Sequence, residues 1–207
     1  MTTLPAQIPI FPLPQAILLP RGRLPLNIFE PSYLKMIEDA LRGPRVVGMI
    51  QPREARSKSD LHDVGCVGRL TSWSETGDGR FLITLSGACR FRIAEELPVA
   101  TPYRQVRADY TAFRDDETPF AGELDIDRAA LFAALEPYLK GKKLEADWTA
   151  ISEAPPEALI NALSMICPFE APEKQALLEA KTLAERATIL IALIEMSAIG
   201  DQGTRLQ

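Results

Sequence analysis

Histidine and cysteine are scarce in this 207-residue chain, which has one histidine and three cysteines. The cysteines, Cys66, Cys89 and Cys167, are far apart and form no CxxC or Cys/His cluster, so neither a zinc site nor a disulfide framework is indicated. The single histidine, His62, lies in a polar stretch that is typical of an exposed loop, without the oriented partners that acid–base catalysis needs. We therefore expect no metal, no cofactor, no catalytic residue, and buried, reduced thiols.

Long apolar runs and the common catalytic motifs are also missing. The longest apolar stretch, residues 187–199, is too short to span a bilayer and contains Glu195. The N-terminus has no basic segment followed by an apolar helix, because its prolines would break one. The chain has no GxSxG, HExxH or GxxxxGK(S/T) motif. These absences predict a cytoplasmic protein without a membrane segment, and they argue against a hydrolase with a familiar site.

A dense basic patch is missing as well. The net charge is −5, and residues 1–113 hold 14 Lys and Arg against 11 Asp and Glu, whereas residues 114–207 hold 9 against 17. The acidic second half would repel phosphate, which argues against nucleic acid as a partner. RNA binding nevertheless stays open as an alternative because of four arginines on neighbouring predicted strands: Arg90, Arg92, Arg104 and Arg107.

The first half of the chain has the pattern of a β-sheet. Short β-branched and aromatic runs alternate there with turn sequences, and a polar, glycine-rich spacer predicts a hairpin between the second and third runs. Gly87 marks a bend. One helix interrupts the strands, because Pro31 suits a first helical position and Gly43 a helix end. The predicted strands cover residues 45–51, 64–73, 80–93 and 103–113.

From residue 122 onward the apolar residues recur at helical spacing. The expected fold class is α+β: a β-rich domain over residues 1–115 with one inserted helix, an α-helical bundle over 120–200, and a flexible tail over 201–207. Pro137 should bend or shorten the first helix of the bundle. The predicted helices cover 123–140, 156–167, a segment from Pro172, and a segment from Thr182 to about Ile199.

The segment 8–31 alternates prolines with large apolar side chains. It has too many aliphatic residues for a free proline-rich ligand, so it should form short, mostly buried strands with prolines at strand starts and edges. Aromatic residues left partly exposed on such a frame would make a peptide-binding patch. The candidate peptide-binding residues are Phe11, Leu13, Phe29 and Tyr33.

Four segments in order carry a family resemblance: "IPIFPL" (8–13), "LLPRGRLPLNIFEPSYLKMIEDAL" (18–41), "VGCVGRL" (64–70) and "GRFLITLSGACRFRI" (79–93). Together they resemble the N-terminal, substrate-binding domain of ATP-dependent Lon proteases. In that family the segments read roughly L-P-x-F-P-L, P-x-x-x-x-P-L-x-I-F-E-x-x-Y, V-G-x-x-A-x-I and G-x-x-R-F-R-I. At the position of Asn27 the family commonly has His.

The resemblance implies a PUA-like β pseudo-barrel followed by a helical bundle, acting as a non-catalytic protein- or peptide-binding module. The implied partners are unfolded or hydrophobic polypeptide segments and other proteins of a proteolysis pathway. The chain ends where a Lon protease would continue into ATPase and Ser-Lys peptidase domains, so we expect neither ATP hydrolysis nor peptide cleavage. PUA-like barrels often bind RNA, which keeps that alternative open beside an unrecognised hydrolase.

Overall fold

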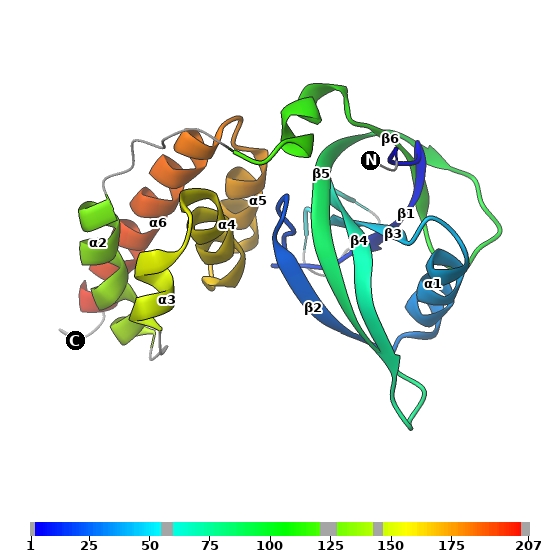
Figure 1. Cartoon of the computed structure of the whole chain (residues 1–207), viewed down its shortest axis with the longest axis horizontal. Helices are drawn as coiled ribbons and strands as arrows, with labels where there is room; N and C mark the ends of the chain where they lie inside the picture. Colours follow the sequence, from blue (N-terminus) through cyan, green and yellow to red (C-terminus); the bar gives the residue numbers. More distant parts are fainter. Residues whose placement is uncertain (1–2, 55–59, 121–127, 143–146, 204–207) are drawn as a thin grey trace. The chain divides into compact units, whose positions relative to one another are not determined.

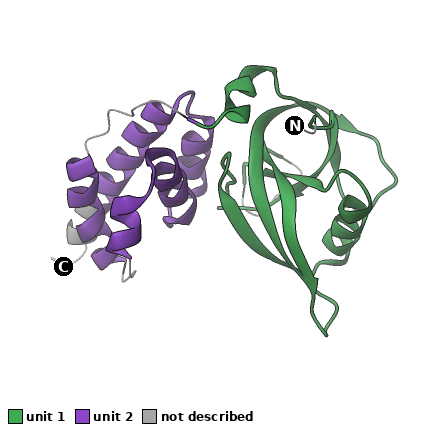
Figure 2. Cartoon of the chain, viewed as in Figure 1, with its two compact units in different colours: residues 1–119 green, residues 120–207 purple. Residues whose placement is uncertain are grey.

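The structure, a computed structural model, describes residues 3–54, 60–120, 128–142 and 147–203, with side chains described as far as residue 197. The chain divides into two compact units, residues 1–119 (unit 1) and 120–207 (unit 2), which are coloured separately in Figure 2. Unit 1 contains the strands and unit 2 the helical second half. The expected α+β fold, a β pseudo-barrel with one inserted helix followed by helices, is confirmed.

Unit 1 is built around a six-stranded sheet that closes on itself (Figure 1). The strand order is β2-β5-β4-β3-β1-β6, and β6 also pairs with β5. Strands β1 and β3 are parallel, and the other pairs are antiparallel. The strands are β1 (Gln7–Pro12), β2 (Arg23–Ile28), β3 (Val46–Ile50), β4 (Val64–Glu75), β5 (Phe81–Leu97) and β6 (Gln105–Asp109).

Strand β5 closes the sheet because its two halves have different neighbours. Its first half, residues 81–86, pairs with β2, and its second half, from residue 92 to 97, pairs with β6. Between the halves, Gly68 pairs with Gly87 and Val67 with Cys89, so one residue of β5 is left over as a bulge. A Cβ at Gly87 would lie 1.9 Å from the Leu19 carbonyl oxygen, so only glycine fits there. The predicted bend at Gly87 is confirmed.

The last predicted strand of the first half, residues 103–113, is longer than the observed one. Strand β6 ends at Asp109, and Thr111–Glu117 form a 3-10 helix, η1. The carboxylate of Asp109 accepts a hydrogen bond of 2.8 Å from the backbone N–H of Thr111, which turns the chain away from the sheet. This local competition for a backbone donor ended the strand early, and the alternation of apolar residues did not reveal it.

Helix α1 (Pro31–Arg42) is the inserted helix, and it begins and ends where the sequence predicted. Its buried residues are Tyr33, Met36, Ile37 and Ala40. A core cluster of the sheet is formed mainly by aliphatic residues of all strands except β2, with Phe91 at full burial. Its members include Ile8, Ile10, Val46, Ile50, Val67, Cys89, Phe91 and Val106. The expectation of a mostly buried frame holds for the first part of segment 8–31, whereas most of β2 is half-buried or exposed.

Within its described residues, unit 2 is a group of five helices in which α6 contacts α2, α4 and α5. Helix α2 continues through Pro137 to Gly141, so the proline does not shorten it as predicted. Helix α6 extends into the predicted tail, while residues 123–127 of the first predicted helix and 204–207 of the tail lie outside the described residues. The helices are α2 (Arg128–Gly141), α3 (Trp148–Glu153), α4 (Pro156–Ile166), α5 (Ala171–Glu179) and α6 (Leu183–Gly203).

Helix α3 was not predicted, because its six residues are too few to show a helical period. The side chain of Asp147 caps it by accepting a 3.0 Å hydrogen bond from the backbone N–H of Ala150. None of the helices in the described part of the chain combines the length and the apolar character needed to cross a membrane.

Candidate functional site

The four predicted site residues differ in their exposure. Phe11 and Tyr33 pack against each other with ring centroids 4.3 Å apart, and each is only 7% exposed. Leu13 is half-buried, whereas Phe29 is 61% exposed. Phe11 and Tyr33 therefore contribute mainly to the core, and of the four residues only Phe29 presents a large apolar surface to solvent.

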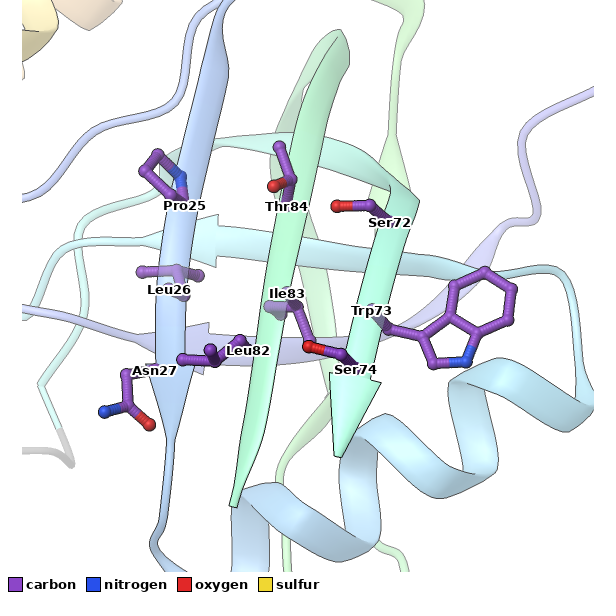
Figure 3. A pocket seen from close by; sticks show the side chains of 9 residues that line it. All are labelled: Pro25, Leu26, Asn27, Ser72, Trp73, Ser74, Leu82, Ile83 and Thr84. Carbon is purple, nitrogen blue, oxygen red and sulfur yellow. The ribbon is translucent and has the colours of Figure 1, made fainter. Parts of the chain in front are cut away.

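A hollow of about 620 Å³ lies over three neighbouring strands, β2, β5 and β4 (Figure 3). The strand register sets its floor, because residues directly opposite each other on antiparallel strands share a face. One cross-strand row is Pro25, Thr84 and Ser72, and the next is Asn27, Leu82 and Ser74. We call this hollow the β2–β5–β4 groove. Its lining residues carry no ionisable group and are Pro25, Leu26, Asn27, Ser72, Trp73, Ser74, Leu82, Ile83 and Thr84.

Large apolar side chains are exposed at one end of this groove. Leu82 is 46% exposed and lies in the last row of the floor, and Phe29 directly follows β2. Trp73 is 44% exposed at the edge of the groove, on the face of β4 opposite to Ser72 and Ser74. In Figure 3 the indole of Trp73 extends beyond β4, away from β5. The groove therefore offers apolar contact area on a neutral surface that is already ordered by the sheet.

An arginine lies over each exposed aromatic ring. The guanidinium carbon of Arg45 is 4.9 Å from the centroid of the Trp73 ring, and that of Arg80 is 5.9 Å from the centroid of Phe29. Such cation–π contacts hold a ring in place while leaving much of it exposed. Ordered rings bind a partner with a smaller loss of side-chain entropy than mobile ones do.

A second hollow, of about 480 Å³, lies beside Tyr33, between β1, α1 and the β5–β6 connection. Its polar groups are largely committed to internal partners. The hydroxyl of Tyr103 donates a 3.0 Å hydrogen bond to Asp39, and burial together with this carboxylate raises the pKa of Tyr103 to about 12. Arg104 donates two hydrogen bonds of 2.6 Å to Glu96. Of the residues that line this hollow, Val99 alone is a large apolar residue with high exposure, at 36%, so this hollow is the weaker candidate.

The arginines behind the RNA alternative are mostly paired with carboxylates. Arg104 is bonded to Glu96, and Arg107 lies 3.2 Å from Glu95. Arg90 is buried, and it donates from its backbone and its guanidinium to the buried carboxylate of Asp116 at 2.8–2.9 Å. A phosphate would have to compete with these partners, which weakens the case for an RNA-binding surface here.

The reactive side chains are buried or lie away from both hollows. Burial raises the pKa of Cys89 to about 12 and that of Cys167 to about 11, which keeps both thiols protonated and poor nucleophiles. His62 is half-buried rather than exposed, because its backbone N–H donates to the Gln51 carbonyl at 3.0 Å and ties the loop to β3. Among the described residues, no cluster of His, Cys, Asp and Glu could hold a metal ion.

Sequence reasoning identified Phe29 but missed Leu82 and Trp73. A signal was present for Leu82, which alternates in step with Thr84 and Ser86. Trp73 gave no such signal, because a residue between Ser72 and Ser74 points to the opposite face of the strand. Apolar residues that share a face with hydroxyl side chains are candidates for partial exposure. The predicted hairpin between residues 64–73 and 80–93 implied that these two strands pair, but the sequence did not indicate that β2 would pair with β5 beside them.

Comparison with known proteins places the chain among Lon sequences. A model of the "ATP-dependent protease La (LON) substrate-binding domain" matches residues 7–196. The chain is 26% identical over 196 residues to Lon protease 2 of Myxococcus xanthus and 28% identical over 199 residues to the Lon protease of Anaeromyxobacter dehalogenans. Each alignment takes in 92% of this chain but 24% and 23% of the relatives, so the chain spans about a quarter of their length.

Two solved structures share the fold. One is the Lon N-terminal domain protein from Xanthomonas campestris, with a TM-score of 0.63, 18% identity, and coverage of 90% of this chain and 97% of that one. The other is the N-terminal domain of the Mycobacterium avium complex Lon protease, with a TM-score of 0.64, 16% identity, and coverage of 91% and 97%. Since the family model covers all but the ends of the sequence, the chain belongs to the ATP-dependent protease La (LON) substrate-binding domain family.

Proposed function

We propose that this chain is a non-catalytic module that binds extended, apolar segments of unfolded polypeptides in the β2–β5–β4 groove. The observation that carries the proposal is the exposure of Phe29, Leu82 and Trp73 around a groove floor without charged side chains. Isolated exposed apolar residues are common on proteins, but several that border one neutral hollow are typical of an interaction site. Membership of a substrate-binding domain family supports the same function.

The shape of the groove suits an extended segment better than a folded surface. Its floor consists of rows of side chains along three strands, with small hydroxyl residues, Ser72, Ser74 and Thr84, that leave room for a ligand. Extended peptides present alternate side chains to such a surface. Strand β2, which forms one side of the groove, is the first strand in the sheet order, and Pro25 has no backbone N–H to offer to an added strand. We therefore expect a bound segment to be held mainly by side-chain contacts and not by pairing with β2.

We propose a non-catalytic module because of the protonation of the thiols and the side chains that line the two hollows. Two of the thiols, Cys89 and Cys167, have raised pKa values. None of the residues that line the two hollows is a histidine, a cysteine or a lysine. The partners that we propose are unfolded or hydrophobic polypeptides, including those handled by a proteolysis pathway.

Replacing Phe29 and Leu82 with serine tests the proposal. Burying a large apolar side chain completely is worth about 1.5–3 kcal/mol, so covering these two partly exposed residues should contribute roughly 2 kcal/mol in total. The double variant should therefore bind about 10- to 30-fold more weakly. The assay is fluorescence anisotropy of labelled, reduced and carboxymethylated α-lactalbumin, which cannot refold, with the native form of that protein as the folded comparison.

A matched control is Met196→Ser in unit 2. Met196 is 67% exposed, so this change removes one large exposed apolar side chain from another part of the chain. It should leave binding of the unfolded polypeptide within about twofold of the original. Equal loss of binding in the control and in the Phe29/Leu82 variant, or unchanged binding in both, would rule out the groove as the site.

A further inference from the structure

The charged residues around the β2–β5–β4 groove are distributed unevenly along its length. One row beyond Thr84, the floor ends at Ser86, which pairs with Arg23 on one side and Arg69 on the other. No carboxylate lies in this row or in the two rows of the floor described above. The Arg23 end of the groove therefore has two arginines and no carboxylate in its row, in a chain whose net charge is −5.

Of these two arginines, Arg23 is the one that a ligand can approach most directly. Arg23 is exposed, whereas Arg69 is half-buried and has a partner within the chain. Strand β2 brings Arg23 to the same face as Pro25 and Asn27, because side chains two residues apart point to the same side of a strand. The cation thus lies in line with the floor of the groove.

The apolar end carries charges of both signs. Asp78 lies in the hairpin between β4 and β5, where it is 2.9 Å from Arg80, and exposed Glu75 ends β4. Because Asp78 and Glu75 offset Arg80 at this end, a negatively charged ligand group is more stable at the Arg23 end, whose row has cations and no carboxylate. The charges therefore set an orientation for any segment that is apolar at one end and acidic at the other.

The distance between the apolar end and the Arg23 end of the groove corresponds to a fixed number of residues in an extended ligand. Leu82 and Ser86 are four residues apart on β5, which corresponds to about 13 Å along a strand. An extended ligand has the same rise per residue and the same alternation. On the proposed function, we infer that the groove selects extended segments in which an apolar side chain and an Asp or Glu side chain are four residues apart.

Peptide binding tests this inference. The probe is the labelled, blocked peptide acetyl-Gly-Phe-Ser-Thr-Ser-Glu-Gly-amide, compared with its Glu→Gln form and with the sequence in reverse order, because the groove can be entered in either direction. Both ends are blocked, so a terminal carboxylate cannot substitute for the side chain. In at least one direction, the Glu peptide should bind about two- to fivefold more tightly than its Gln form, as expected for a solvent-exposed ion pair. That preference should disappear at high salt.

Two protein variants separate the charge from the apolar contact. In Arg23→Ser the Glu and Gln peptides should bind equally, at the level of the Gln peptide. In Leu82→Ser both should bind more weakly while the Glu preference remains. Equal binding of the two peptides to the unaltered protein, with loss of both in Leu82→Ser, would overturn the acidic preference and leave the proposed function intact. Binding that does not depend on Leu82 at all would overturn both.

Discussion

Replacing Asp116 with alanine should destabilise unit 1 more than almost any other single change of a polar residue. The carboxylate accepts hydrogen bonds from the backbone N–H of Arg90 at 2.9 Å, from its Nε at 2.9 Å and from a terminal guanidinium nitrogen at 2.8 Å. Arg21 also donates to the Asp116 carbonyl at 2.6 Å. Through these contacts Asp116 attaches helix η1 to strand β5.

The magnitude follows from burial. Arg90 is 6% exposed and Asp116 is 7% exposed, so the alanine variant would leave a guanidinium buried without its carboxylate. Removing one partner of a buried ion pair costs about 3–5 kcal/mol. Replacing both residues, as in Arg90→Met with Asp116→Ala, removes the uncompensated charge. We therefore expect the double variant to be more stable than Asp116→Ala alone, with a coupling free energy of roughly 1–3 kcal/mol.

Urea unfolding of the full chain can measure this effect in unit 1 alone. The chain has two tryptophans, Trp73 in unit 1 and Trp148 in unit 2, so a Trp148→Phe background makes fluorescence report on unit 1. This precaution matters because a chain with two units need not unfold in one step. If Asp116→Ala lowers the free energy of unfolding by less than about 1 kcal/mol, the ion pair contributes no more than an exposed one, and its burial does not determine its contribution.

Two further predictions concern the bulge and a buried thiol. Gly87→Ala should lower the free energy of unfolding of unit 1 by more than about 2 kcal/mol in the same assay, because the new Cβ would lie 1.9 Å from the Leu19 carbonyl oxygen. The control is Gly77→Ala, where the new Cβ would have no atom within 4 Å, and it should change the free energy of unfolding by less than about 0.5 kcal/mol. Similar costs at the two glycines would contradict the predicted close approach. The pKa of Cys89, raised from 9.0 to about 12 by burial, means that the folded state holds its thiol proton more tightly than the unfolded state does. The corresponding stability is complete below pH 9 and is lost as the pH rises from 9 towards 12, so the stability difference between the original protein and Cys89→Ala should shrink over that range. A difference that does not vary with pH would show that the thiol is not shielded.

Local patterns predicted much of unit 1. Short apolar and β-branched runs bounded by turns identified β3 and β4, and alternation with a period of two identified β5, because successive side chains of a strand point to opposite faces. Gly87 was predicted as a bend, and Pro31 and Gly43 as the ends of α1, since these residue types have backbone preferences that act at their own positions. The error at the end of β6 arose where a local hydrogen bond competed with the pattern.

The candidate site was only partly predictable, because exposure depends on what covers a residue. Phe11, Phe29 and Tyr33 look alike in the sequence, yet Phe11 and Tyr33 are buried against each other where α1 contacts β1, and Phe29 is left in solvent. The sequence by itself determined which side chains share a face of each strand, since that follows from the geometry of the extended backbone. Only the tertiary structure decided that the face with Leu82 is left open and that Arg23 lies in line with it. Pairing between strands distant in the chain sets both, and no local preference of the backbone encodes that pairing.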